Sequence, residues 1–180
     1  MFLSSNSKIN VTLCGMMGSG KSVTGKMLAK KINFKFVDTD ILIEKKTGKS
    51  INSIFKEDGE ESFRSLEKEI IINILKKKNY VISLGGGSIL NNEIRNSIKL
   101  NSYNIYLEVN TEILNQRLIN SKKRPLINNK NTKETLKQLI KKREKFYQEA
   151  DLIIKNELSI KNALDNIINN LKNNKKNNKY

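Results

Sequence analysis

The sequence predicts a single α/β domain built on a parallel sheet. Short apolar runs alternate along the chain with longer amphipathic patterns, which is typical of strands joined by crossover helices. A chain of 180 residues, of which 37% are hydrophobic, can bury one modest core but not two. No apolar run reaches the roughly 18 residues that a membrane-spanning helix needs, so we expect no membrane segment.

Five short apolar runs are the expected strands. They are Ile9–Cys14, Phe34–Val37, Tyr80–Leu84, Asn104–Val109 and Asp151–Ile154. Amphipathic patterns predict helices at Ser22–Ile32, from Ser50, at Glu60–Lys77, from Thr111, from about Asn131 to Gln148, and at Ser159–Leu171. Ser50 is a suitable capping residue, and Asn131 with Glu134 has the spacing of a capping box. Ligands of such sheets bind at the carboxyl ends of the strands, so the residues after each strand are candidates for a site.

Composition excludes several classes of chemistry. The chain has no histidine, which excludes His-based triads, zinc sites and general bases. Its one cysteine, Cys14, excludes an internal disulfide and favours a reducing compartment, so we expect a cytoplasmic protein. The net charge is +16, but Lys, Asn and Ile together supply 79 of 180 residues and all have A/T-rich codons. Base composition therefore accounts for much of the charge, and we expect no nucleic-acid partner.

The organisation along the chain is simple. We expect one domain over residues 1–171, with a lid at about 120–133. The stretch Lys172–Tyr180 is basic and of low complexity, and we expect it to be disordered.

A phosphate-binding loop follows the first expected strand. Gly15–Ser22, with the sequence GMMGSGKS, matches G-x-x-x-x-G-K-[ST] in full. Its glycines allow backbone N–H groups to wrap a phosphate, and the following helix adds a favourable dipole. Lys21 is expected to reach the β- and γ-phosphates, and the Ser22 hydroxyl to bind Mg²⁺. This motif predicts a nucleotide, but it is shared by GTPases, ATPases, nucleotide kinases and metabolite kinases.

Two aspartates follow the second expected strand. Asp38 is placed to help hold Mg²⁺ through water, and Asp40 could accept a hydrogen bond from a substrate hydroxyl and take its proton. The alternative is a turn in which aspartate binds local backbone. Arg64 lies in an expected helix with Glu67 three positions later, so Glu67 could orient its guanidinium toward a carboxylate. A helical arginine can equally be a surface residue.

Three further features have both a functional and a plain interpretation. Gly85–Gly87 directly follow a strand, which suits close approach of a ligand to bare backbone, although a flexible loop is the alternative. Arg124 precedes the only proline in a basic segment, and it could swing onto a transferring phosphoryl group or lie in a solvated loop. Arg143 could bind a ligand or occupy a surface helix face.

Taken together, these residues resemble the shikimate kinase family of P-loop proteins. The resemblance runs from about Lys8 to Leu171. Its motifs are GMMGSGKS at 15–22, FVDTDILIE at 36–44, TGKSINSIFKEDGEESFRSLE at 47–67, SLGGGS at 83–88, RPL at 124–126 and KKREKFYQEAD at 141–151. The resemblance implies a three-layer α/β/α P-loop fold with a five-stranded parallel sheet of order 2-3-1-4-5 and a mobile lid. It also implies a monomer that uses MgATP to phosphorylate the 3-hydroxyl of shikimate in aromatic amino-acid (chorismate) biosynthesis.

The resemblance implies roles for individual residues. Lys21, Asp40 and Arg124 are the implied catalytic residues, and Ser22 with Asp38 the implied Mg²⁺ residues. The implied ATP-binding residues are Gly15, Gly18, Ser19, Gly20, Lys21, Ser22, Val23, Arg117 and Arg124. The implied shikimate-binding residues are Asp40, Arg64, Gly85, Gly86, Gly87 and Arg143, with Ile51, Phe55 and Phe63 as apolar neighbours. Four of the five arginines thus fall on ligand positions, which agrees with bidentate recognition of carboxylate and phosphate.

Four other functions compete with this interpretation. A gluconate kinase would be expected to carry a histidine near the second aspartate, and this chain has none. A nucleotide kinase would need a nucleobase site that the sequence does not reveal. A basic nucleic-acid-binding protein would explain the charge but not the placement of Asp38, Asp40 and Arg64. A relative that binds without catalysis is disfavoured by the intact Lys21, Ser22, Asp38 and Arg124.

Overall fold

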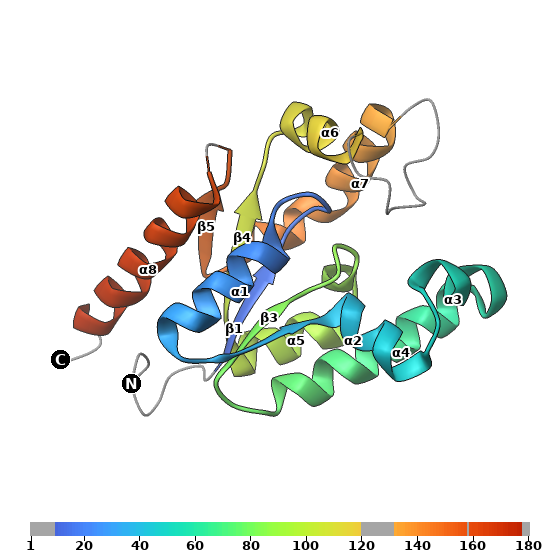
Figure 1. The fold of residues 1–180 in the computed structure, drawn as a ribbon, viewed down its shortest axis with the longest axis horizontal. Coiled ribbons are helices and arrows are strands. Elements are labelled where there is room, and N and C mark those ends of the chain that lie inside the picture. The colour runs from blue at the N-terminus through green and yellow to red at the C-terminus, as the bar shows by residue number, and fades with distance from the viewer. Residues whose placement is uncertain (1–9, 120–131, 158, 178–180) are drawn as a thin grey trace.

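The computed structural model describes residues 10–119, 132–157 and 159–177. They form a five-stranded parallel sheet of order β2-β3-β1-β4-β5, as the sequence resemblance implied (Figure 1). The strands are β1 (Asn10–Cys14), β2 (Lys35–Asp38), β3 (Tyr80–Ser83), β4 (Ser102–Glu108) and β5 (Leu152–Lys155). Their bounds lie within two residues of the predicted ones, except that Ile9 lies outside the described residues.

Helices cover both faces of the sheet and complete the three layers (Figure 1). They are α1 (Lys21–Ile32), α2 (Thr39–Thr47), α3 (Ile51–Glu57), α4 (Gly59–Leu75), η1 (Ser88–Leu90), α5 (Asn92–Asn101), α6 (Thr111–Ile119), α7 (Thr132–Tyr147) and α8 (Ile160–Asn177). Because strand side chains alternate, β4 directs Ile105 and Leu107 toward α1 and α8 and Tyr106 toward the opposite cluster. That opposite cluster contains buried residues of α4, α5, α6 and α7.

Three helical regions differ from the sequence prediction. The helix α2, which directly follows β2, was not among the predicted helices. The stretch after the glycines forms η1 and α5, which we did not predict; Asn91 caps α5 by accepting from Ile94 N at 3.1 Å. Ile94 and Ile98, one turn apart, are both buried. The helix α8 continues to Asn177, beyond the predicted helix end at Leu171. Once a helix is nucleated, each added residue needs only one further backbone bond.

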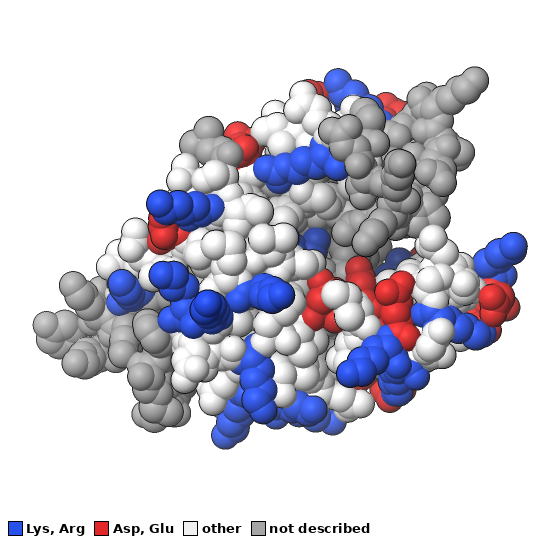
Figure 2. Space-filling view, viewed as in Figure 1, with Lys and Arg blue, Asp and Glu red and all other residues white. Residues whose placement is uncertain are grey.

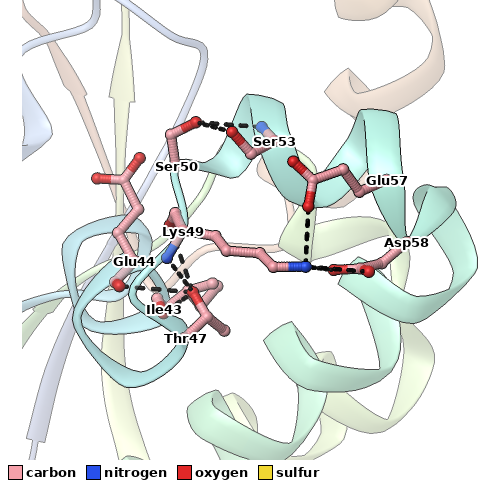
Figure 3. A network of polar contacts seen from close by, with 8 residues as sticks. All are labelled: Ile43, Glu44, Thr47, Lys49, Ser50, Ser53, Glu57 and Asp58. Carbon is pink, nitrogen blue, oxygen red and sulfur yellow. Dashed lines mark hydrogen bonds and ion pairs between the residues drawn. The ribbon is translucent and has the colours of Figure 1, made fainter.

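The corner between α2 and α3 is held by polar contacts (Figure 3). Ser50 caps α3 by accepting from Ser53 N at 3.1 Å, as predicted. Lys49 Nζ lies 3.0 Å from Glu57 Oε2 and 3.1 Å from Asp58 Oδ2. Its hydrogen bonds to Glu57 and Asp58 raise the pKa of the lysine. Exposed ion pairs contribute little to the free energy of folding. We therefore attribute the start of α3 at this corner to the Ser50 cap.

None of the helices in the described ranges combines the length and the apolar character that crossing a membrane requires.

We expect Asn10→Ala to destabilise the fold without changing catalysis. Asn10 is fully buried at the start of β1, far along the strand from the P-loop. Its side chain donates to Leu75 O at 3.0 Å and Lys77 O at 2.7 Å, and accepts from Tyr80 N at 3.0 Å. Removing these bonds should lower the free energy of unfolding by about 3 kcal/mol, measured by urea denaturation.

The matched control is Asn170→Ala, because Asn170 makes only an exposed bond to Asn166 O within α8. Its effect should stay within about 0.5 kcal/mol. Equal stability of the Asn10 and Asn170 variants would contradict the importance of the buried amide.

Candidate active site

The predicted site residues that the structure describes gather at the carboxyl edge of three neighbouring strands. In the sheet β3 lies between β2 and β1. The loop Gly85–Gly87, which follows β3, is therefore placed between Asp38–Asp40 after β2 and the P-loop after β1. Figure 2 shows acidic side chains gathered where α2 and α4 lie in Figure 1, whereas lysine and arginine side chains are spread over the α1 side. Asp40 belongs to α2, the helix that directly follows β2.

The P-loop has the backbone that its glycines predict. Gly18 and Gly20 have φ of 80° and 89°, a left-handed conformation that side chains disfavour. Lys21 opens α1 and is 9% exposed. Its Nζ donates to Gly15 O and Met16 O, both at 2.9 Å, so the ammonium lies across the loop that it is expected to serve.

Asp38 binds local backbone, as the turn interpretation predicted, and also contacts Ser22 of the P-loop, whereas its role toward Mg²⁺ stays a prediction. Its Oδ1 caps α2 by accepting from Asp40 N at 3.1 Å and Ile41 N at 3.4 Å. Its Oδ2 accepts from Ser22 Oγ at 2.5 Å. A hydroxyl and a carboxylate oxygen side by side at a phosphate loop are the oxygen ligands that Mg²⁺ prefers, so this pair fits the implied ion.

The glycine loop leaves room for charged side chains on its β2 side. A Cβ on Gly85 would lie 2.7 Å from both Asp40 Oδ1 and Glu67 Oε1. A Cβ on Gly87 would lie 2.8 Å from both Nη atoms of Arg64. Such contacts are too short for real atoms, so any side chain at these two positions would displace the carboxylates and the guanidinium. The bare backbone thus admits close approach of these protein groups, and the approach of a ligand to it stays a prediction.

Glu67 orients Arg64, as the three-residue spacing predicted. Glu67 is 2% exposed; it accepts from Arg64 Nη1 at 2.7 Å and from Ser88 Oγ at 2.6 Å. Glu60 accepts from Arg64 Nε and Nη2, both at 3.2 Å. Burial disfavours the charged guanidinium, but the charge and hydrogen bonds of Glu67 and then Glu60 outweigh it, and the pKa of Arg64 is raised.

Aromatic rings complete the surroundings of Arg64. Its guanidinium lies 5.1 Å from the ring centre of Phe63 and 5.9 Å from that of Phe55. The two rings are themselves 4.6 Å apart. The two phenylalanines that the resemblance placed near the acid therefore lie beside Arg64, and Arg64 is only partly exposed.

Arg143 is buried, so the alternative that it lies on a surface helix face is wrong. It is 5% exposed, and its Nη1 contacts Met16 Sδ at 3.8 Å. The same Nη1 lies 3.4 Å from where a Cβ on Gly86 would stand. Within the described residues its Nε has no hydrogen-bond partner. A buried guanidinium with an unpaired N–H and a weak sulfur acceptor retains the capacity to bind an anion.

Tyr147 holds the glycine loop, and sequence reasoning missed it. It lies one turn after Arg143 on α7 and donates its hydroxyl to Gly86 O at 2.6 Å. Its ring stacks on Tyr106 with centres 4.9 Å apart. Burial raises the pKa of Tyr147, so the phenol stays protonated and can donate. The spacing of four from Arg143 was the available signal.

The remaining arginines have distinct environments. Arg117 donates to Gly18 O at 3.2 Å and to Asn156 O at 3.0 Å, which places it against the P-loop. Arg95 stacks on Phe146 at 4.0 Å and donates to Ile89 O at 2.9 Å, which is a structural role. Val23 is half exposed on the first turn of α1. Arg124 and the predicted lid segment up to residue 131 lie outside the described residues.

Known proteins are similar to this chain in both sequence and fold. The model of the family "Shikimate kinase" matches residues 17–172. A shikimate kinase from Persephonella marina is 46% identical over 148 residues, covering 82% of this chain and 89% of that protein. The chain belongs to the shikimate kinase family.

Solved structures have the same fold as this chain. Shikimate kinase from Acinetobacter baumannii in complex with shikimate superposes with a TM-score of 0.88 at 32% identity, covering 97% of each chain. A gluconokinase from Sinorhizobium meliloti superposes with a TM-score of 0.68 at 16% identity, covering 94% of this chain and 95% of that one. The second likeness shows the fold alone, so the shikimate kinase family and the gluconate rival share an architecture.

We expect the single thiol of the chain to be unreactive in the native protein. Cys14 immediately precedes the P-loop and is 2% exposed, and burial raises the pKa of its thiol to about 12. A thiol whose pKa is raised stays neutral at every pH below that value, so little thiolate forms at pH 8. Native protein should therefore not react with Ellman's reagent over an hour, whereas protein in 8 M urea should release one equivalent. Rapid stoichiometric reaction of the native protein would contradict the burial.

Proposed function

We propose that this chain transfers the γ-phosphoryl group of ATP to the 3-hydroxyl of shikimate, within aromatic amino-acid biosynthesis. The main support is the position of two arginines from different helices. Arg64 of α4 and Arg143 of α7 both lie against the bare backbone of Gly85–Gly87. That loop lies between the P-loop and Asp40 along the sheet edge. Such an arrangement suits a small hydroxylated acid held next to a triphosphate.

The acid would be held through its carboxylate. Among the residues that the structure describes, no group pairs with the buried Nε–H of Arg143, and Arg64 is fixed in direction by Glu67 and Glu60. Arginine forks bind carboxylates bidentately, and a buried arginine gains most from a charged partner. Phe55 and Phe63 would flank the apolar side of the ring. Ile51 lies on the same helix as Phe55 and belongs to the same apolar cluster.

The nucleotide would be bound at the P-loop. We assign its phosphates to Gly15, Gly18, Ser19, Gly20, Lys21 and Ser22, with Val23 and Arg117 on the nucleoside side and Arg124 as the lid residue. Ser22 and Asp38 would hold Mg²⁺, which when bound neutralises charge on the phosphate oxygens. Lys21 would exchange its bonds to Gly15 O and Met16 O for phosphate oxygens.

The transfer would be in line and direct. Phosphoryl transfer needs positioning and charge stabilisation more than covalent chemistry. Asp40, beside Gly85, would accept the hydrogen bond of the attacking hydroxyl and so direct its lone pair toward phosphorus. Lys21 and Arg124 would stabilise the negative charge that develops on the transferred group. As the new P–O bond forms and the bond from the γ-phosphorus to the β,γ-bridging oxygen breaks to release ADP, Asp40 would take the proton of the hydroxyl.

The other parts of the proposal concern partners and location. We propose that the protein acts as a monomer, without a nucleic-acid partner, in the cytoplasm. The single, buried Cys14 supports a reducing compartment. One domain carries every described residue of the proposed site, which supports a monomeric enzyme.

The function is tested by ADP release with different acceptors. Shikimate should support turnover, whereas gluconate, nucleoside monophosphates and no acceptor should give only background release. Lys21→Met should lower kcat with shikimate by at least about a hundredfold, because it removes a charge that stabilises the transition state. Turnover with gluconate and not with shikimate would contradict the proposed acceptor.

We expect Arg64→Lys to raise the KM for shikimate by at least about tenfold. Lysine keeps the charge but loses the fork that Glu67 and Glu60 orient, which removes a charge-assisted hydrogen bond. Steady-state kinetics with saturating ATP measures the effect. The matched control is Arg95→Lys, because Arg95 also stacks on a ring but lies against η1 carbonyls. Equal KM values for the two variants would contradict the role of Arg64.

A further inference from the structure

Asn156 is a buried residue that touches the P-loop and has no role in the site described so far. It directly follows β5 and is 1% exposed. Its side-chain Nδ2 donates to Ser19 O at 2.7 Å. The contact joins positions 137 residues apart, from the far edge of the sheet to the middle of the phosphate loop.

The backbone of Asn156 is itself fixed, so its side chain is presented from a rigid place. Its N–H donates to Glu108 O, the last residue of β4, at 2.8 Å. Its carbonyl accepts from Arg117 Nη2 at 3.0 Å. Arg117 Nη1 donates in turn to Gly18 O at 3.2 Å. Asn156 and Arg117 therefore hold two successive carbonyls of the P-loop and are bonded to each other.

Holding the Ser19 carbonyl fixes the direction of the next N–H. The peptide bond between Ser19 and Gly20 is planar and trans, so its C=O and N–H point to opposite sides. With the carbonyl bonded to Asn156, the Gly20 N–H is turned to the side of the loop away from Asn156. Gly20 precedes Lys21 and caps α1, where backbone N–H groups bind phosphate in loops of this kind.

The side chain of Asn156 also accounts for the glycine at position 20. A Cβ on Gly20 would lie 2.8 Å from Asn156 Nδ2, and φ there is +89°. The amide therefore fills the space that a side chain at position 20 would need. Rotation of the peptide plane would break the bond to Ser19 O and bring loop atoms against the amide.

We propose that Asn156 is a positioning residue for phosphate binding, which keeps the Gly20 N–H directed at the nucleotide by holding the Ser19 carbonyl. The inference rests on the proposed function, because it concerns the loop that binds ATP. A freely rotating peptide would present that donor only part of the time, which weakens binding. The acid site contains none of these groups, so its affinity is independent of Asn156.

The test compares nucleotide and acid affinity in matched variants. Asn156→Asp keeps the shape but replaces the donor with an acceptor that repels the Ser19 carbonyl, and Asn156→Ala removes the amide. Calorimetry with ADP, together with KM values for ATP and shikimate, gives the readout. Asn10→Ala is the control, because it removes a buried amide of similar bonding outside the site.

Both Asn156 variants should weaken ADP binding and raise the KM for ATP by at least about tenfold, with the KM for shikimate within about twofold of wild type. Asn10→Ala should lower the melting temperature but leave all three values within about twofold. ADP affinity unchanged in the Asn156 variants would overturn the inference. So would failure of both variants to fold where Asn10→Ala folds, since the amide would then serve the fold and not the loop. Wild-type protein that binds no ADP would instead refute the proposed function.

Discussion

Three consecutive residues without side chains make the acid side of this site possible. The loop Gly85–Gly87 passes beside Asp40, Glu67, Arg64 and Arg143, and at Gly85 and Gly87 it leaves no space for a side chain. A single Cβ would collide with a carboxylate at the first position and with a guanidinium at the third. The charged groups can therefore lie close to one another only because the backbone between them is bare.

The balance of buried charge explains how such a site is stable before substrate arrives. An unpaired buried charge is costly, whereas a charge with well-placed hydrogen bonds is tolerated. Glu67 is matched by Arg64 and Ser88, so the pair forms a fixed support. Arg143 is less well satisfied, since its Nη1 contacts the Met16 sulfur and its Nε is unpaired among the described residues. The carboxylate of a bound acid would complete that partial set.

The sequence predicted those parts of the site whose residues lie close together along the chain. The P-loop follows from one contiguous motif, and the orientation of Arg64 by Glu67 follows from one helical turn. Asp38 was ambiguous because one carboxylate both caps α2 and meets Ser22. The expected strands were within two residues because each is a short apolar run between polar turns.

The parts that sequence could not predict depend on distant packing. Whether Arg143 is buried depends on which face of α7 packs toward the sheet. Its charged neighbours in the sequence indicated an exposed face instead. Asn156 is one of 26 asparagines, and only the approach of the β5 loop to Ser19 distinguishes it. The helix at 92–101 was missed because only two of its residues, Ile94 and Ile98, are buried apolar ones. Arg124 remains a prediction from the sequence.

The central claim is that a nucleotide and a hydroxylated acid bind side by side at one sheet edge, separated by the glycine loop. A crystal structure with a non-hydrolysable ATP analogue and shikimate measures this directly. The account predicts the shikimate carboxylate within hydrogen-bonding distance of Arg64 and Arg143, and a ring hydroxyl between Asp40 and the γ-phosphate. An acid bound away from both arginines, with the nucleotide in the P-loop, would contradict it.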